Sequence, residues 1–266
     1  MVKMGTVWER TAEFLTDNFT VILPISLLAY FVPLSIQGNF GPVIENAGPE
    51  LVFALSLITL GFSALVTWGW LTLAAMALDQ ERDPGAVGLR RLLPALIVSI
   101  LIFLALCLLA LPPALTIMVT GRGAEDLSLS LPIAVMWALS IYCLLAIVAG
   151  IWITARLILV YPVIVAEKAM LGAVLRSWRL TRGIAVPIVG VTLLYTLVAT
   201  VAVVATKLVF GSVFTLVAGP GGGLSLSSVL TSVMVAAVQT GFFAVVPVFT
   251  AKLYQAVIGA GAAVRA

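Results

Sequence analysis

Six long apolar stretches, separated by short polar ones, run the length of the chain. A helix needs about 20 apolar residues to cross a bilayer core about 30 Å thick, and an isolated segment in lipid has to be helical to satisfy its backbone. The pattern therefore predicts an all-α, polytopic membrane helical bundle with six transmembrane helices. Their expected ranges are 19–37, 51–78, 93–118, 132–160, 186–209 and 229–258.

Lysine and arginine lie almost entirely on one side of this arrangement. The loops after the first, third and fifth spans are rich in Gly, Pro and Ser, and that side holds only Arg122 and Lys207. The other side holds the remaining basic residues: Lys3, Arg10, Arg82, Arg90, Arg91, Arg156, Lys168, Arg176, Arg179, Arg182, Lys252 and Arg265. Because basic loops stay in the cytoplasm, we expect both termini to be cytoplasmic.

An amphipathic segment precedes each odd-numbered span. In residues 1–18, Val7 and Thr11 share one helical face, and Glu9 lies on the opposite face. We therefore expect residues 1–18 to form an amphipathic helix on the cytoplasmic membrane surface. The six-helix transmembrane domain would then occupy residues 19–266.

The same organisation recurs before the third and fifth spans. Asp83 and Pro84 are typical of a helix start, with a carboxylate cap and a proline in the first turn, and they open a short surface helix. Pro24, Pro94 and Pro187 each lie near the start of the span that follows such a segment. This spacing indicates a threefold internal repeat of surface helix, span, outer loop and span, although three prolines near span ends can also agree by chance.

Composition excludes several classes of function. Of the 266 residues, 62% are hydrophobic and 9% are charged, whereas soluble domains carry about 25% charged residues, so lipid has to cover most of the surface. The chain has no histidine, the most common general base and zinc ligand near neutral pH. We therefore expect no enzymatic activity, no catalytic or metal-binding residue and no cofactor. The net charge of +3 reflects orientation, so no nucleic-acid partner is expected.

The most informative stretch is residues 155–183, which follow the fourth span. Arg156 lies at the cytoplasmic end of that span, where a long side chain can reach the headgroups. Pro162 is expected to bend the chain from spanning to surface-lying. Residues 168–182 then have the clearest amphipathic pattern in the chain and predict a helix on the membrane surface.

Glu167 is the residue of this stretch that most needs explaining. Helical spacing places it on the apolar side of the surface helix, beside Trp178. An unpaired carboxylate there is costly, so we expect Arg156, Tyr254 or Arg182 to pair with it. The structural interpretation is a latch that fixes the surface helix to the bundle; a proton relay is the alternative. The expected latch residues are Arg156, Pro162, Glu167, Trp178 and Tyr254.

The opposite side of this helix carries a basic face, formed by Lys168, Arg176, Arg179 and Arg182. These residues face the anionic inner leaflet, where each charge contributes about 1 kcal/mol of attraction. Membrane lipids with anionic headgroups are therefore the expected partners. The alternative is general anchoring, from which any cytoplasmic helix next to the membrane benefits.

Few polar residues lie within the spans. Thr192, Thr196 and Thr200 follow one face of the fifth span, which indicates close helix packing or, alternatively, a polar permeation path. Gln239 is the only amide deep in a span, and we expect it to make one interhelical hydrogen bond. Lys207 lies near the outer end of the fifth span and should reach outward.

The run from Arg156 to Gly183 resembles the bacterial glycerophosphoryl diester phosphodiesterase membrane-domain family, and the segment FTAKLYQAV, which contains Tyr254, is similar to the last span of that family. The motif positions are Pro162, Glu167, Arg176, Ser177, Trp178, Leu180, Thr181 and Gly183. The resemblance implies a bacterial inner-membrane protein with a role linked to lipids or envelope upkeep. The soluble phosphodiesterase fused to some members uses histidines and a carboxylate metal cluster, which this chain lacks.

These features lead to two main hypotheses. The first is a non-enzymatic inner-membrane protein that binds or organises lipid, or scaffolds a protein partner, through its cytoplasmic surface helices. The second is a small-solute or lipid transporter, which would need a polar cavity between the repeats. An intramembrane enzyme is disfavoured, because the spans contain no paired carboxylates and the chain has no histidine.

Overall fold

The computed structural model describes residues 3–44, 47–79, 83–120, 132–219 and 225–263. All regular structure in these residues is helical, and six segments are long and apolar enough to cross a membrane. These segments are Phe19–Gln37, Pro49–Ala77, Pro84–Thr116, Ile133–Glu167, Ala185–Ala218 and Leu226–Ala260. The fold class is therefore the one predicted, an all-α polytopic bundle, and the chain is a multi-pass integral membrane protein. Arg82, Arg122 and Arg265 lie outside the described residues.

The first span keeps its predicted bounds but is not a uniform α-helix. It consists of α2 (Phe19–Ser26), the π-helical segment η1 (Leu27–Phe31) and α3 (Val32–Gln37). In η1 the Val32 amide donates to the Leu27 carbonyl, five residues back, which widens the helix locally. Ala29 and Tyr30 on this wider turn are completely buried.

The second span, α5 (Pro49–Ala77), follows the short helix α4 (Phe40–Ile44) and packs against the wider turn. Gly69 is buried at this contact, where an added Cβ would clash with the Cβ of Ala29. The absent side chain thus lets the two spans approach closely.

The third span, α6 (Pro84–Thr120), begins at the predicted cap, where the Asp83 carboxylate accepts a hydrogen bond from the Ala86 amide at 3.1 Å. The separate surface helix expected before this span is wrong, since α6 continues through Pro94 without a break. The neighbouring helix explains the difference. The indole Nε1 of Trp68 on α5 donates to the Gly85 carbonyl at 3.1 Å, which aligns the first turn of α6 with α5.

The remaining helices are α1 (Met4–Asp17), α8 (Ile133–Leu157), α9 (Val160–Glu167), α10 (Gly172–Leu180), α11 (Ala185–Ala218) and α12 (Leu226–Ala263). As predicted, α1 is amphipathic: Val7 and Thr11 are buried, while Glu9 is exposed. Its apolar face packs against α12.

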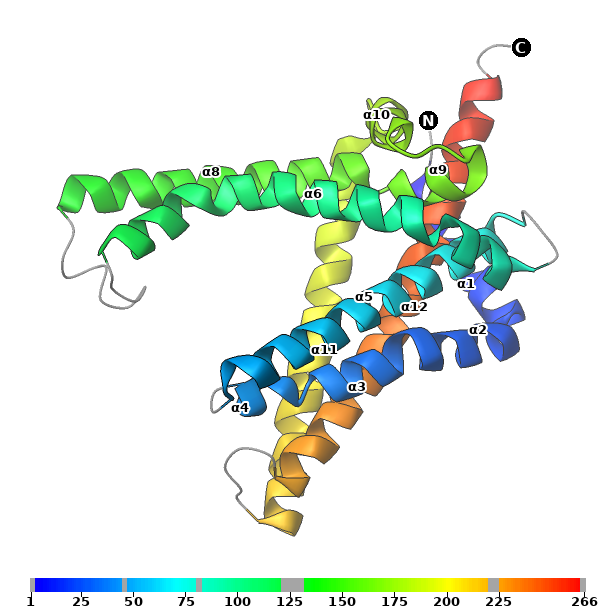
Figure 1. The fold of residues 1–266 in the computed structure, drawn as a ribbon. Coiled ribbons are helices and arrows are strands. Elements are labelled where there is room, and N and C mark those ends of the chain that lie inside the picture. The colour runs from blue at the N-terminus through cyan, green and yellow to red at the C-terminus, as the bar shows by residue number, and fades with distance from the viewer. Residues whose placement is uncertain (1–2, 45–46, 80–82, 121–131, 220–224, 264–266) are drawn as a thin grey trace.

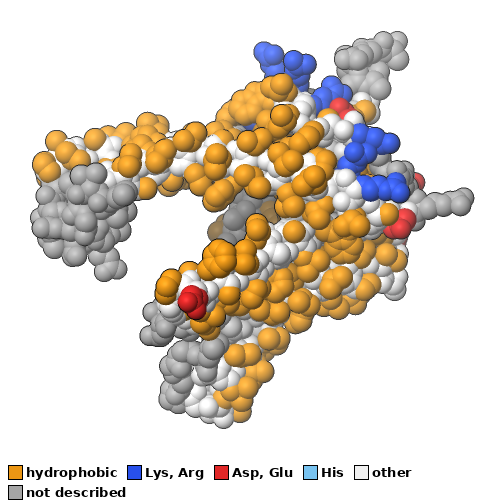
Figure 2. Space-filling view, in the orientation of Figure 1, with side chains coloured by type: hydrophobic (Ala, Val, Ile, Leu, Met, Phe, Trp, Pro, Cys, Tyr) orange, Lys and Arg blue, Asp and Glu red, His pale blue; other side chains and the backbone are white. Residues whose placement is uncertain are grey.

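The long helices pair as hairpins whose far ends diverge. Figure 1 shows α6 with α8, α3 with α5, and α11 with α12 running outward from a common region near α9 and α10. Leu71, Ile164 and Leu253 are completely buried in this common core. Along the hairpins, by contrast, large apolar side chains are exposed, and Figure 2 shows them covering the arms, whereas lysine and arginine side chains gather near the core end. The threefold repeat stays a prediction.

The Gly69 contact gives a first prediction. Replacing Gly69 with Ala should destabilise the protein by about 1–3 kcal/mol, because the new methyl group overpacks against Ala29. Gly61→Ala, on the same helix with nothing within 4 Å of the added Cβ, should leave stability unchanged or raise it by up to about 1 kcal/mol. Unfolding of both variants in mixed micelles measures the difference; equal stabilities would contradict the close contact.

Candidate functional site

The segment around Glu167 departs from the sequence prediction of one continuous surface helix over 168–182. Instead, α9 ends at Glu167, Lys168 adopts a left-handed conformation with φ 55°, and α10 begins only at Gly172. The cause lies in α9, whose residues 162–165 are buried in the core, so the chain has to turn before α10 can lie across the bundle. Glu167 therefore ends α9, and its expected place on the apolar face of the surface helix is wrong.

Glu167 has two partners from two other helices. Its Oε1 atom accepts hydrogen bonds from the hydroxyl of Tyr254 on α12 and from Nε of Arg176 on α10, each at 3.0 Å. Tyr254 was one of the expected partners, whereas the expected pairing with Arg156 or Arg182 is not formed. The side chains of Arg176 and Glu167 are 47% and 30% exposed, so the ion pair itself contributes little to stability.

Arg156, at the end of α8, is bound to α10 through both its backbone and its side chain. Its carbonyl accepts hydrogen bonds from the hydroxyls of Ser177 at 2.7 Å and Thr181 at 3.3 Å. Its guanidinium lies between the Trp152 and Trp178 rings, 5.2 and 5.3 Å from their centres, and Nη1 donates to the Trp178 carbonyl at 3.4 Å. The last carbonyls of a helix have no partner within it, so α10 supplies the missing donors for α8.

A second junction of this kind joins α1, α5 and α12. The ammonium of Lys252 on α12 donates to the carbonyl of Ala77, the last residue of α5, at 2.9 Å and lies 4.6 Å from the centre of the Phe14 ring. A cation is favourable at a helix C-terminus, where the last carbonyls carry partial negative charge. Sequence reasoning counted Lys252 only for orientation; its isolation on a long apolar helix was the available signal.

The basic face is only partly free to meet lipid. Arg176, expected to face the headgroups, bonds to Glu167, while Lys168, Arg179 and Arg182 are exposed and have no acidic partner in the described part of the chain. Figure 2 shows basic side chains beside apolar ones at the end of the molecule where α10 lies. The exposed cations of this region are therefore Lys168, Arg179 and Arg182.

An apolar groove of about 340 Å³ lies between α6, α8 and α10, and its wall residue Leu175 is one helical turn before Arg179. Leu171 and Leu175 on its α10 wall are 56% and 66% exposed, and Leu106 and Leu157 form part of the other walls. Trp178 is 42% exposed. Such side chains are unfavourable in water, so this side of α10 has to lie against lipid or another apolar surface.

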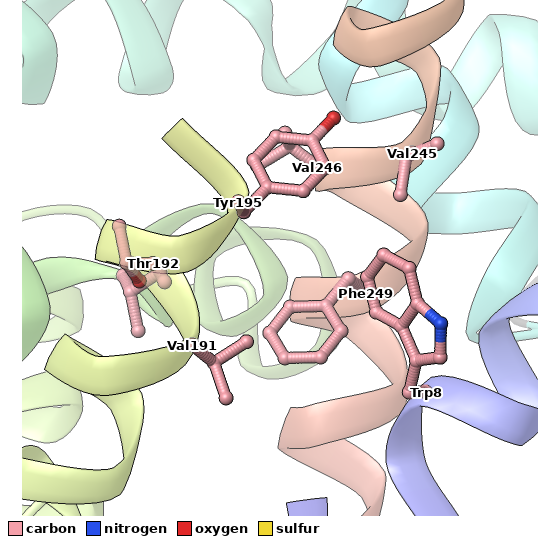
Figure 3. Close-up of a pocket in the computed structure, with 8 residues that line it drawn as sticks. Trp8, Val191, Thr192, Tyr195, Val245, Val246 and Phe249 are labelled. Carbon is pink, nitrogen blue, oxygen red and sulfur yellow. The ribbon is translucent and has the colours of Figure 1, made fainter. Parts of the chain in front are cut away.

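An aromatic hollow lies between α1, α11 and α12. Figure 3 shows the Trp8 ring beside Phe249, with Tyr195 and Thr192 on α11 lining the same space, which measures about 50 Å³. A neighbouring apolar hollow of about 460 Å³ shares Trp8 and Tyr195. The Tyr195 hydroxyl donates to the Phe242 carbonyl at 2.5 Å, so these walls present mainly hydrocarbon. Sequence reasoning did not single out this hollow.

A polar cavity of about 620 Å³ lies between α3, α11 and α12, and it differs from the other hollows in being rich in polar side chains. Lys207, Gln239 and Asn39 line it, together with serine and threonine hydroxyls. The interhelical hydrogen bond expected for Gln239 is absent within the described residues, because the adjacent space is open. Thr196 and Thr200 are exposed elsewhere on α11 and do not line this cavity.

None of these sites provides a metal centre: the described residues contain no group of three or more Cys, Asp or Glu side chains that could hold a metal ion. Comparisons of the chain with protein-family models, curated proteins and solved structures found no match. The function therefore has to be argued from the geometry of the chain itself.

The α8–α10 junction gives a second prediction. Ser177→Ala should destabilise the protein by about 1–2 kcal/mol, because the Arg156 carbonyl would lose the bond from the buried Ser177 hydroxyl and keep only the longer bond from Thr181. Ser212→Ala removes an exposed hydroxyl that bonds only within its own helix and should change stability by less than about 0.5 kcal/mol. Chemical unfolding in micelles compares the two. A Ser177→Ala protein as stable as the parent would show that the junction is not structural.

Proposed function

We propose that this chain is a non-enzymatic integral protein of a bacterial inner membrane that binds anionic lipid headgroups at its cytoplasmic end. The observation that carries the proposal is the set of exposed cations on and next to α10, Lys168, Arg179 and Arg182, together with the apolar groove that the same helix lines. A phospholipid has the same two-part chemistry, an anionic group joined to hydrocarbon. Each cation would contribute about 1 kcal/mol of attraction to an anionic leaflet.

The surroundings of Arg156 support a site at this depth. Its Nε atom is buried and has no hydrogen-bond partner among the described residues. The flanking rings of Trp152 and Trp178 are 39% and 42% exposed, and tryptophan is enriched where hydrocarbon meets headgroups. A bound phosphate oxygen or a water molecule would supply the missing acceptor.

The same cluster supports the latch interpretation over the proton relay. Glu167 is held between Arg176 and Tyr254, and Ser177 joins α10 to the end of α8. These contacts fix a rigid platform for the exposed cations. A scaffold for a protein partner would use the same platform.

Membership of the glycerophosphoryl diester phosphodiesterase membrane-domain family is part of this proposal. The motif positions Glu167, Arg176, Ser177, Trp178 and Thr181 all take part in the contacts that join α8, α9, α10 and α12. A motif whose members bind one another is what a shared structural element requires. The support is thus the motif and its geometry.

A transporter is the second candidate function, and the polar cavity that reaches Gln239 is the observation that favours it. Alternating access would also need this cavity to open toward the other side of the membrane. Tyr30, Leu71 and Leu253, which are completely buried, fill the common core instead. A binding role therefore accounts for more of the described contacts than transport does.

The proposed orientation leads to a third prediction. A reporter that is active only outside the cytoplasm should work when inserted after Ile44, and a reporter that fluoresces only in the cytoplasm should work after Gly183. The physical reason is the concentration of basic residues on the side that contains Gly183. Placement of both positions in the same compartment would contradict the six-span topology.

Lipid binding leads to a fourth prediction. The double variant Arg179→Gln/Arg182→Gln should bind phosphatidylglycerol more weakly by about 2 kcal/mol, or roughly 30-fold in affinity, as measured by native mass spectrometry of the purified chain. Lys3→Gln/Arg10→Gln removes the same charge from exposed positions on the N-terminal segment and should have a much smaller effect. Equal losses in both double variants would show general attraction to the leaflet and would exclude a specific site at α10.

A further inference from the structure

The polar cavity lies far from the proposed cytoplasmic lipid site. Lys207 follows the start of α11 by 22 residues, or about 33 Å at the helical rise of 1.5 Å per residue. Gln239 precedes Lys252 on α12 by 13 residues, or about 20 Å. With Lys252 near the cytoplasmic interface, Gln239 falls in the opposite half of the bilayer and Lys207 near its outer surface. The cavity thus extends from the outer interface into the membrane.

Two donor side chains of this cavity, Lys207 and Gln239, have no hydrogen-bond partner among the described residues. Lys207 provides three N–H donors and Gln239 two, and neither side chain makes a hydrogen bond or an ion pair with any described residue. Gln239 is partly buried, and an amide within a membrane span is costly without a partner, so its donors require a ligand or water in the cavity. Among the described residues, the lining contains no acidic side chain and one charged side chain, that of Lys207.

The other polar groups of the cavity mainly offer acceptors. Thr231 and Ser232 donate their hydroxyl protons to carbonyls of their own helix, at 2.7 and 2.8 Å. Asn39 donates its amide protons to the Ser35 carbonyl at 2.9 Å and to the Ser232 hydroxyl at 2.7 Å. The bond from Asn39 to Ser232 joins the end of α3 to α12. Among the described residues, the Asn39 carbonyl oxygen and the Thr231 oxygen have no donor and are free to accept. A ligand would therefore meet a cation and an amide at one place and acceptors at another.

We propose that this cavity binds a singly charged anion that also carries hydroxyl groups, with Lys207 and Gln239 contacting the anionic group. The described lining, with one lysine and no acidic residue, matches a single negative charge, and its free oxygens match hydroxyl donors. Two sources have this chemistry: the headgroup of an anionic phospholipid in the outer leaflet and a small soluble hydroxy acid. The exposed apolar residues Val204 and Leu208 on α11 leave the flank of the same helix open to lipid.

Phosphatidylglycerol and gluconate are suitable probes, because each combines one negative charge with hydroxyl groups. Binding of each to the purified full-length chain would be measured by native mass spectrometry and by titration calorimetry. We expect Lys207→Gln to weaken binding of at least one probe by roughly 10-fold or more, as expected for the loss of a charge-assisted hydrogen bond. Gln239→Leu, which leaves the charge unchanged, should weaken the same probe by roughly 5-fold, the size of one lost neutral hydrogen bond.

Two controls separate this site from the cytoplasmic one. Lys3→Gln removes one positive charge elsewhere and should leave unchanged the binding of whichever probe Lys207→Gln weakens. If that probe is gluconate, Arg179→Gln/Arg182→Gln should also leave its binding unchanged. For phosphatidylglycerol, Lys207→Gln and Arg179→Gln/Arg182→Gln should each weaken the binding of a different lipid molecule. Their effects on lipid affinity should therefore be independent of each other. If Lys207→Gln weakens binding of the lipid alone, the cavity is a headgroup site. If it weakens binding of gluconate alone, the cavity is a solute site. The proposal would be overturned if Lys207→Gln and Gln239→Leu kept the melting curve of the parent and bound both probes as tightly as the parent does. The cavity would then be assigned to water.

Discussion

Hydrocarbon offers no hydrogen-bond partner to a peptide backbone, and the whole architecture depends on this constraint. Each span has to satisfy its own amides and carbonyls, which a continuous helix does everywhere except at its ends. The ends therefore need polar partners from elsewhere in the protein or from water. In this chain they receive them where the basic residues gather.

Two junctions show how the ends are satisfied. The last carbonyl of α5 accepts from Lys252, and the Arg156 carbonyl near the end of α8 accepts from Ser177 and Thr181. Both contacts join segments far apart in the sequence, so capping a helix also fixes its position relative to another. Toward the far ends of the hairpins, two bonds of this kind join neighbouring helices: Asn39 donates to Ser232, and the Tyr142 hydroxyl donates to the Leu109 carbonyl. The helices thus share a packed core at one end, while the hairpins diverge from one another at the other (Figure 1).

Features that depend on local sequence could be predicted, and features that depend on distant partners could not. The first span keeps its expected bounds, and the Asp83 cap forms as its sequence indicates, because both follow from apolar length or from a contact three residues away. Of the two partners of Glu167, Tyr254 was among those predicted and Arg176 was not. Helical spacing assumed one continuous helix, whereas the left-handed turn at Lys168 brings Arg176 back toward Glu167. The polar cavity could not be found from single spans either, since Lys207, Gln239 and Asn39 come together only when three helices pack.

The π-helical turn in the first span has a consequence for insertions and deletions. A π-turn holds one residue more than the α-helical turn it replaces, so it behaves as a single-residue insertion accommodated within the helix. Loss of one residue within 27–31 would return this turn to α-helical pitch and keep Ile22 and Pro33 on the faces they now occupy. The same loss elsewhere in the span would rotate one half of the helix by about 100° relative to the other. This turn is therefore the place where the length of the first span can change in evolution without exchanging its lipid-facing and protein-facing sides.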